Sequence, residues 1–533
     1  MKRIIFLFLA AILIITLGAC NPGDKGSADG GASSASAGTS ATANQSESVI
    51  SIPMQTHSYL MYPSGFNDSS NNTNNDSVKT HFVIDGKVLA TPMDGTMAKA
   101  WPADDGALQM IMSNDNNDLY QLKGDSFDRI ASDVTMVQIA PDNDTFCYVS
   151  DQTLYVRKLS GTESTRVADI KINLKNVDVE FSPDGKTLLY NDQSINDASE
   201  QTLWLYDGTL TKIGDNLIGM AVSNGGSDIY YYDKGQQALY HTSMNADKRT
   251  ELVAGGDLNG AAGLTMINKD HTQLLYTIYS GTGTNYDSSV YITYFLNNDN
   301  EKVKLDGLNG SPHIPNTPFQ SIEDPDKLTN QLYSVNNGGV YYFDDKFHIK
   351  KIAADTQGVQ LAQNGKTLVY QRNNNLYRMD DWRKANAEQI ASGISSTTFR
   401  ASWMMTTDGS TVYYINSDKE LYVVRGTAES EKIADNVNSM NLSHDNILFY
   451  ITDMNENFGL GSLYACTSAS DKERIADDVY IGLDAEVNTT IYLQAEDPTQ
   501  TDFAKMKCDV YSAASGKNFE VIIKSVDLPD YRY

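Results

Sequence analysis

The stretch that decides the fold of this chain is Val177-Asp-Val-Glu-Phe-Ser-Pro-Asp-Gly-Lys-Thr-Leu-Leu-Tyr190. In its first part, Val177, Val179 and Phe181 alternate with two carboxylates, and this alternation predicts a strand with one apolar face. The Ser-Pro-Asp-Gly sequence that follows predicts a tight turn, because proline fixes φ at about −65° and glycine accepts a positive φ. The next run, Thr187–Tyr190, carries apolar residues on both sides, as expected of a strand that packs on both faces.

Two further strands complete the repeating unit. Leu203-Trp-Leu-Tyr206 follows a polar loop, and an Asp207-Gly208 turn leads into a fourth strand near residues 211–214. The whole pattern recurs about every 40 residues, which is the signature of a repeat fold. Unit ends share a short phrase, seen at Ile130-Ala-Ser-Asp133, Ile433-Ala-Asp-Asn436 and Ile475-Ala-Asp-Asp478. Further copies of the strand pattern lie at 138–156, 229–232, 274–278, 359–377, 412–415 and 447–451.

A four-stranded unit at this period predicts an all-β fold, a β-propeller of four-stranded antiparallel blades. We expect about eight blades within residues 98–533, with a range of roughly seven to ten because some copies are weak. Residues 49–97 are expected to hold N-terminal strands and an Asn-rich loop. In the clearest unit, Leu189 should be buried between blades, whereas Asp207 should be exposed.

The copies that contain Ser-Pro-Asp-Gly-Lys, followed by apolar residues ending in Tyr, resemble the WD40-like repeat of the TolB propeller and of the propellers in prolyl-oligopeptidase relatives. Phrases such as Val340-Tyr-Tyr-Phe-Asp344 and Leu239-Tyr-His-Thr-Ser243 also resemble uncharacterised propeller lipoproteins of Gram-positive bacteria. The resemblance covers residues 98–526. It implies the fold, but it implies no activity, because such repeats are structural and functional sites lie elsewhere.

The N-terminus predicts export and anchoring. Two basic residues precede the apolar run Ile4–Ile15, whose length suits the core of a signal peptide better than a membrane span. Leu17-Gly-Ala-Cys20 resembles a bacterial lipobox, which implies cleavage before Cys20 and a diacylglyceryl group on its thiol. An ordinary secretory signal with a chance cysteine is the alternative. Residues 1–19 are thus assigned to a lipoprotein signal peptide, and residues 20–48, rich in Gly, Ser and Ala, to a disordered tether.

The net charge of −27 limits the partners. Nucleic acid is not expected, because its phosphates require clustered Lys and Arg. Anionic lipid headgroups would repel the chain, so membrane association should depend on the lipid anchor, at the extracytoplasmic face of the cell membrane. The acidic clusters 115–118 and 142–144 lack the ligand spacing of an EF-hand, and solvated turns are their simplest interpretation. No metal site and no cofactor are predicted.

Catalytic motifs are missing from the sequence. It contains no Gly-x-Ser-x-Gly elbow, and its seven histidines form no His-x-x-x-His or His-x-His pair. The carboxylates are too numerous for sequence to single out a glycosidase-like pair or to exclude one. Besides Cys20, the chain holds Cys147, Cys466 and Cys508. Cys466 and Cys508 either form a disulfide or pack as buried thiols, and packing is the favoured interpretation.

Candidate ligand-binding residues come from the expected first strands of the blades. The polar alternates Gln138, Asp178 and Gln360 cannot be buried unpaired without a cost of about 1 to 3 kcal/mol each, so we expect them to face water or a ligand at a mouth of the central channel. Trp403 is the candidate stacking group there. The 31 tyrosines favour strand packing as their main role, with stacking on sugar or peptide as the sharper alternative.

These patterns together predict a lipid-anchored, extracytoplasmic β-propeller that acts as a non-catalytic binding or scaffolding module of the bacterial cell envelope. Its partner would be an envelope protein, a peptide or a glycan. One alternative is an envelope carbohydrate-active enzyme, a hydrolase or lyase, with its site on the propeller face. The other is a structural spacer without a ligand.

Overall fold

The structure is a computed structural model of the 533-residue chain. The chain divides into two units, Met1–Ser48 and Val49–Tyr533, and every described residue belongs to the second. The signal peptide, Cys20 and the tether therefore lie outside the described residues, and so does Asp178. The described residues are 59–64, 79–84, 87–88, 93–94, 97–102, 108–113, 117–124, 126–142, 144–170, 179–193, 201–244, 249–253, 262–280, 290–296, 302–305, 312–315, 326–335, 338–346, 348–384, 386–395, 402–455, 459–480, 484–486, 489–500 and 506–527.

These residues form β-strands and two three-residue 3-10 helices, η1 (Asn224–Gly226) and η4 (Trp382–Lys384). No helix in this part of the chain has the length and apolar character to cross a membrane. The strands up to residue 253 are β1 (Tyr59–Ser64), β2 (Lys79–Ile84), β3 (Lys87–Val88), β4 (Met93–Asp94), β5 (Met97–Pro102), β6 (Leu108–Ser113), β7 (Leu119–Lys123), β8 (Ser126–Ala131), β9 (Val134–Ile139), β10 (Thr145–Ser150), β11 (Thr153–Lys158), β12 (Ser164–Asp169), β13 (Val179–Phe181), β14 (Leu188–Gln193), β15 (Gln201–Tyr206), β16 (Leu210–Asp215), β17 (Leu217–Val222), β18 (Ile229–Asp233), β19 (Ala238–Thr242) and β20 (Thr250–Val253).

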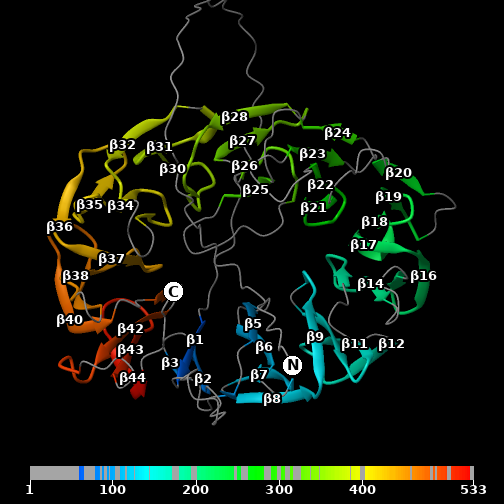
Figure 1. The fold of residues 1–533 in the computed structure, drawn as a ribbon, viewed down its shortest axis with the longest axis horizontal. Helices are drawn as coiled ribbons and strands as arrows, with labels where there is room; N and C mark the ends of the chain where they lie inside the picture. The colour runs from blue at the N-terminus through cyan, green and yellow to red at the C-terminus, as the bar shows by residue number, and fades with distance from the viewer. Residues whose placement is uncertain are drawn as a thin grey trace, which may run out of the picture. The chain divides into compact units, whose positions relative to one another are not determined.

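The remaining strands follow the same alternation of short strand and turn (Figure 1). They are β21 (Ala262–Ile267), β22 (Leu274–Ser280), β23 (Val290–Leu296), β24 (Lys302–Lys304), β25 (Pro312–His313), β26 (Leu332–Val335), β27 (Gly339–Phe343), β28 (Ile349–Ala353), β29 (Val359–Leu361), β30 (Leu368–Arg372), β31 (Asn375–Met379), β32 (Glu388–Ser392), β33 (Trp403–Met405), β34 (Thr411–Ile415), β35 (Leu421–Arg425), β36 (Glu431–Ala434), β37 (Val437–Leu442), β38 (Leu448–Thr452), β39 (Leu460–Cys466), β40 (Glu473–Tyr480), β41 (Asp484–Glu486), β42 (Thr489–Ala495), β43 (Lys507–Ala513) and β44 (Glu520–Asp527).

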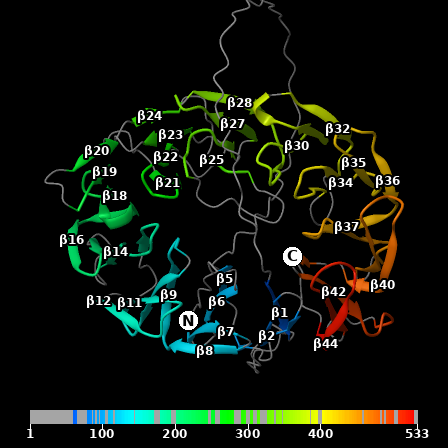
Figure 2. The same cartoon turned by 180° about the vertical axis from the view of Figure 1, so that it is seen from behind.

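Consecutive strands pair antiparallel into sheets that succeed one another along the chain, as the colour order in Figure 2 also shows from behind. Within the described residues, strands β1 to β36 form nine four-stranded sheets, each from four consecutive strands. Strands β37 to β44 form one eight-stranded sheet, because Val479 of β40 pairs with Gln494 of β42. In the first sheet, β4 pairs with β2.

The predicted all-β fold and its four-stranded antiparallel units are confirmed. The expected number of about eight blades in residues 98–533 is not confirmed: strands β5 to β36 form eight four-stranded sheets in the described residues, and β37 to β44 add the eight-stranded one. Strands of only two residues, such as β3, β4 and β25, are too short to show an alternating pattern, so the sequence gives little sign of the sheets that contain them. The number of blades in a closed ring stays a prediction.

Neighbouring sheets pack through apolar faces. Leu189 of β14 is 1 % exposed and shares one apolar cluster with Ile229 and Tyr231 of the next sheet, whereas Asp207 is exposed. Both expectations for these residues are confirmed. A second cluster places Val83 of β2 with residues of β42 and β43, so a sheet at the start of the described chain contacts the sheet at its end.

Stacked tyrosine pairs join the second and third strands of many sheets. Tyr370 of β30 lies directly opposite Tyr377 of β31, and their ring centroids are 5.4 Å apart at an interplanar angle of 14°. Such cross-strand aromatic pairs stabilise a sheet beyond the area that they bury. Packing thus accounts for at least part of the tyrosine content. Equivalent pairs are Tyr148–Tyr155, Tyr231–Tyr240, Tyr414–Tyr422, Tyr450–Tyr464 and Tyr492–Tyr511.

Candidate functional site: the first-hairpin turns

The turn between the first and second strands of a sheet, here called the first-hairpin turn, has a recurring backbone. The N–H of its first residue donates to the carbonyl of its last, as from Ser182 to Thr187 at 2.8 Å. The N–H of its fourth residue donates to the carbonyl of its first, as from Gly185 to Ser182 at 2.9 Å. The turns with both bonds are 182–187, 223–228, 268–273, 362–367, 406–411 and the one-residue-shorter 443–447.

The fourth residue of each turn has a left-handed backbone. Glycine adopts this conformation without strain, and Gly185, with a φ of 65°, matches the turn that the sequence predicts. Gly409 occupies the same position with a φ of 73°. In two turns, however, the position is taken by His271 and Asn446, with φ values of 57° and 59°. A glycine at the fourth position therefore suits this turn, but the turn does not require one.

Carboxylates inside the turns accept hydrogen bonds from the turn itself. One carboxylate oxygen of Asp408 accepts from the Thr406 hydroxyl at 2.7 Å and from the Ser410 backbone N–H at 2.9 Å. Burial alone would raise the pKa of the Asp408 carboxyl, but the hydrogen bonds from Ser410 and Thr406 outweigh it and leave the pKa below its ordinary value. The Asp408 carboxylate is thus held ionised as an acceptor that closes the turn.

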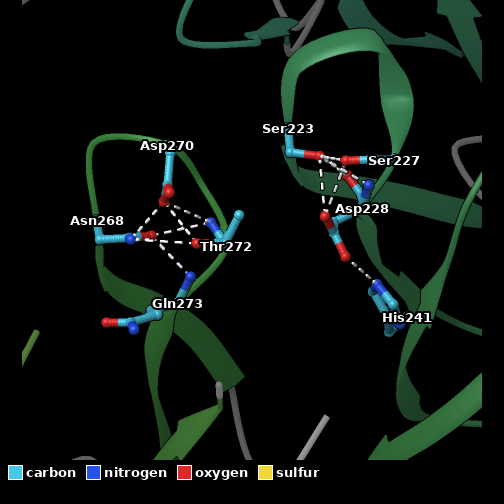
Figure 3. A network of polar contacts seen from close by, with 8 residues as sticks. All are labelled: Ser223, Ser227, Asp228, His241, Asn268, Asp270, Thr272 and Gln273. Atoms are coloured by element: carbon cyan, nitrogen blue, oxygen red, sulfur yellow. Dashed lines mark hydrogen bonds and ion pairs between the residues drawn. The ribbon is translucent and has the colours of Figure 1, made fainter. Parts of the chain in front are cut away.

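Figure 3 shows the first-hairpin turn 223–228 beside its neighbour 268–273. One oxygen of Asp228 accepts from the hydroxyls of Ser223 and Ser227 at 3.1 and 3.0 Å, and the other lies 2.9 Å from Nε2 of His241 on β19. The hydrogen bond with His241 is the main cause that lowers the pKa of Asp228, and it outweighs the opposing effect of burial. The His241 ring also contacts the ring of Tyr230, with centroids 5.0 Å apart.

The order of groups around Asp228 suits a structural role. In a nucleophilic triad, the histidine lies between the hydroxyl and the carboxylate, so that it can take the hydroxyl proton. Here the carboxylate lies between the hydroxyls and the imidazole, so the hydroxyls of Ser223 and Ser227 donate to Asp228 and not to His241. This arrangement fixes the turn on strand β19 and does not activate a serine.

The neighbouring turn is closed by Asn268 and tied to the preceding sheet by His271. The side-chain oxygen of Asn268 accepts from the backbone N–H groups of Thr272 and Gln273 at 2.9 and 2.7 Å. Nδ1 of His271 lies 2.9 Å from the carbonyl oxygen of Val222, which can only accept, so Nδ1 carries the proton. Burial is the main cause that lowers the pKa of His271 and favours the neutral imidazole, and it outweighs the hydrogen bond to Val222, which acts in the opposite direction.

Further hydrogen bonds join one first-hairpin turn to the next. The backbone N–H of Asp184 donates to the side-chain oxygen of Asn224 in the neighbouring sheet at 3.0 Å. The backbone N–H of Gln363 donates to the carbonyl of Thr407 at 2.9 Å, and the backbone N–H of Thr407 donates to the side-chain oxygen of Asn446 at 3.2 Å. These bonds link neighbouring turns into polar edges, one of turns 182–187 and 223–228 and another of turns 362–367, 406–411 and 443–447.

The structure brings two of the four sequence-predicted ligand residues to the same junction. Gln360 of β29 is half-buried, and its side-chain oxygen accepts from the backbone N–H of Met405 in β33 at 3.2 Å. Trp403 of β33 is 6 % exposed and belongs to the apolar cluster between these two sheets. Gln138 of β9 is half-buried elsewhere. The side-chain oxygen of Gln360 thus has a backbone partner, and ligand binding by all four residues stays a prediction.

Sequence reasoning did not single out Asp228, His241 or His271. A signal for Asp228 was present, since Ser223 and Asp228 have the same spacing as Ser182 and Thr187 at the ends of the recognised turn. No local signal marks the other two residues, because His241 and Val222 are brought to their partners only by strand pairing and sheet packing.

Cys147, Cys466 and Cys508 are buried thiols that form no disulfide, so the alternative of a Cys466–Cys508 disulfide is wrong for this structure. Burial raises the pKa of both Cys466 and Cys508 to about 12, which keeps them protonated and poorly reactive. In the described part of the chain, no three His, Cys, Asp or Glu side chains gather in a way that could hold a metal ion.

No family model matches the chain, and no curated protein matches it. The solved structures that it is similar to include the tricorn protease, at 14 % identity over 79 % of this chain and 51 % of that chain, with a TM-score of 0.25. An oligogalacturonate lyase from Vibrio parahaemolyticus matches at 10 % identity over 69 % and 96 %, with a TM-score of 0.30. A GH74 xyloglucanase from Xanthomonas campestris matches at 11 % identity over 87 % and 78 %, with a TM-score of 0.28.

This chain therefore spans about half the length of the tricorn protease. These TM-scores are too low to assign a fold or a function to this chain. Its fold class rests on its own strand pairing. The resemblance to TolB-like propellers and to propeller lipoproteins stays a prediction.

Proposed function

We propose that this chain is a lipid-anchored, extracytoplasmic β-propeller that binds or scaffolds other components of the bacterial cell envelope without catalysing a reaction. The observation that carries the proposal is the polar edge of linked first-hairpin turns. Its carboxylates and hydroxyls already bond to one another, as Asp228 does with Ser223, Ser227 and His241, and this suits a rigid binding surface more than an acid–base pair. Lipidation at Cys20 would hold that surface at the membrane.

The binding role is tested with a photo-cross-linking amino acid placed at either edge of one sheet. Ser410 is exposed in a first-hairpin turn, and Asp418 is exposed in the turn at the opposite edge, between β34 and β35. In cells that carry the full lipoprotein, we expect a discrete cross-linked product from the Ser410 position and none from the Asp418 position. Equal products from both positions, or none from either, would contradict binding at the first-hairpin edge.

The anchor is tested separately with Cys20→Ser, which should leave the protein unprocessed or release it from the membrane fraction. A lipidated, membrane-bound variant would contradict the lipobox interpretation. The enzyme alternative is tested with the same purified lipoprotein on envelope polysaccharides. Steady release of reducing or unsaturated sugar ends would replace the non-catalytic proposal with a hydrolase or lyase.

A further inference from the structure

A small hollow of about 350 Å³ lies where two neighbouring sheets meet. Its walls come from β27 and β28 of one sheet and from η4 of the next. None of these residues belongs to a first-hairpin turn, so the hollow is separate from the site described above. The lining residues are Tyr342, Lys350, Lys351, Ile352, Trp382 and Arg383.

The hollow gathers positive charge in a chain where Asp and Glu outnumber Lys and Arg by 68 to 41. Among the residues that the structure describes, no carboxylate forms an ion pair with Lys350, Lys351 or Arg383. The acidic side chains of the same loops have other partners, since Asp381 pairs with Lys384 at 3.2 Å and Asp344 with His348 at 3.2 Å. These three exposed cations thus form no ion pair within the described residues, although the Asp381 carboxylate accepts from the backbone N–H of Arg383 at 3.2 Å.

Aromatic rings hold one of these cations in place. The Arg383 guanidinium carbon lies 4.3 Å from the centroid of the Trp382 ring. Trp382 is 1 % exposed, and its indole N–H donates to the carbonyl of Gly365 at 2.9 Å, so the ring is fixed. Tyr342 packs on that ring with centroids 5.1 Å apart, and its hydroxyl donates to the side-chain oxygen of Asn330 at 2.5 Å. A stacked guanidinium keeps its N–H donors available at its edge.

Lys350 supplies a second charge on the same side of the sheet. It lies directly opposite Tyr342 in the pairing of β27 with β28, and directly opposed side chains share one face of a sheet. Lys351, the next residue along, pairs with Tyr341, and its Nζ lies 5.8 Å from the centroid of the Tyr341 ring. Arg383 and Lys350 are therefore the two cations best placed to act together.

We propose that this hollow binds a phosphate group, with Arg383 donating a bidentate pair of hydrogen bonds and Lys350 supplying a point charge. A phosphate monoester carries about −1.5 to −2 charges near neutral pH, so it balances two unpaired cations better than a carboxylate does. The acidic remainder of the chain does not forbid such a site, because salt screens exposed charges beyond about 8 Å at physiological ionic strength. The source is either free inorganic phosphate or a phosphate group on a larger envelope molecule.

The test uses the full-length lipoprotein in detergent, titrated with inorganic phosphate, glucose 1-phosphate or acetate and followed by calorimetry and ³¹P NMR. We expect both phosphates to bind and acetate to bind at least about tenfold more weakly. Arg383→Gln should weaken phosphate binding by about tenfold or more, and Arg383→Gln with Lys350→Gln should abolish it. The matched control is Lys384→Gln, which removes a neighbouring cation that is already paired, and it should change the affinity by less than about twofold.

Several outcomes overturn the proposal. These are no phosphate binding by the wild type, undiminished binding by the double variant with an unchanged melting temperature, or acetate binding as tight as phosphate binding. If the double variant unfolds, Lys350→Gln is tested alone. Lys350 is exposed, so this variant should fold, and it should still weaken phosphate binding. Preference for glucose 1-phosphate over inorganic phosphate would assign the source to a larger phosphorylated molecule, and the reverse preference to the free ion. The result stands apart from the cross-linking test of the proposed function, because neither Ser410 nor Asp418 lines the hollow.

Discussion

Two first-hairpin turns reach the same backbone by different chemistry. In 406–411 the left-handed fourth position is Gly409, whereas in 268–273 it is His271. Glycine satisfies the backbone and adds no side-chain contact. Histidine is strained in that conformation, but its ring is buried and bonds to Val222 in the neighbouring sheet. The turn backbone is therefore set by the hairpin, and the side chain at its fourth position decides how firmly the turn is tied to the next sheet.

The largest expected effect concerns the apolar packing between neighbouring sheets. Leu189→Ala should lower the free energy of unfolding by about 2 to 5 kcal/mol, because it removes buried methyl groups and leaves a cavity. Asp207→Ala, at an exposed turn, should change it by less than about 0.5 kcal/mol. Urea titration of both variants measures the difference. Equal losses would mean that the sheet interface is not the main source of stability.

Gly409→Ala tests the turn that has glycine at its fourth position. A Cβ there would lie 2.7 Å from the Cβ of Ala362 in the neighbouring turn, in addition to the cost of a φ of 73°, and we expect a loss of about 2 to 3 kcal/mol. Gly426, with a φ of 58° and open space around it, is the matched control. Gly426→Ala should cost only the backbone strain, about 1 kcal/mol. Similar melting temperatures for the two variants would show that the turns are not in close contact.

The carboxylate at the end of a turn should contribute less. Asp228→Asn removes the charge that accepts from Ser223, Ser227 and His241, and we expect a loss of about 1 to 2 kcal/mol near neutral pH. Because the folded state lowers the pKa of Asp228, this contribution is present above its unfolded value near 3.8 and is lost as the pH falls through the folded value. Wild type and variant should therefore converge in acid-unfolding experiments. A constant gap down to strongly acidic pH would contradict the assigned hydrogen bonds.

The smallest expected effect is the pH dependence that His271 contributes. Its pKa is lowered in the folded state, so below about pH 6.5 the unfolded chain binds a proton that folded His271 does not. Stability should decline as the pH falls from 6.5 towards the lowered pKa. His271→Asn, which tolerates the left-handed backbone, should remove this part of the slope. Melting temperatures at several pH values between about 5 and 7.5 provide the measurement, and an unchanged slope would place His271 in contact with water.

The parts of the fold that are local in sequence could be predicted, and the parts set by packing could not. Alternation around Val179 and the Pro-Asp-Gly turn identified a hairpin, and the left-handed φ of Gly185 agrees with it. The two-residue strands could not be predicted, because two residues are too few to show an alternation of apolar and polar side chains. Among the site residues, Gln360 was expected to face water or a ligand. Nothing in the sequence indicates that its side-chain oxygen accepts from the backbone N–H of Met405, because only the contact between two sheets supplies this partner.

The most direct test of the linked turn edge is amide hydrogen exchange at Asp184, whose N–H donates to Asn224 of the neighbouring turn at 3.0 Å. We predict that this amide is protected in the wild type and exchanges at least about tenfold faster in Asn224→Ala. The Gly185 amide, which donates to Ser182 within its own turn, should keep its protection in both proteins. If the Asp184 amide is unprotected in the wild type, or is equally protected in both, the turns are independent and the rigid polar edge does not exist.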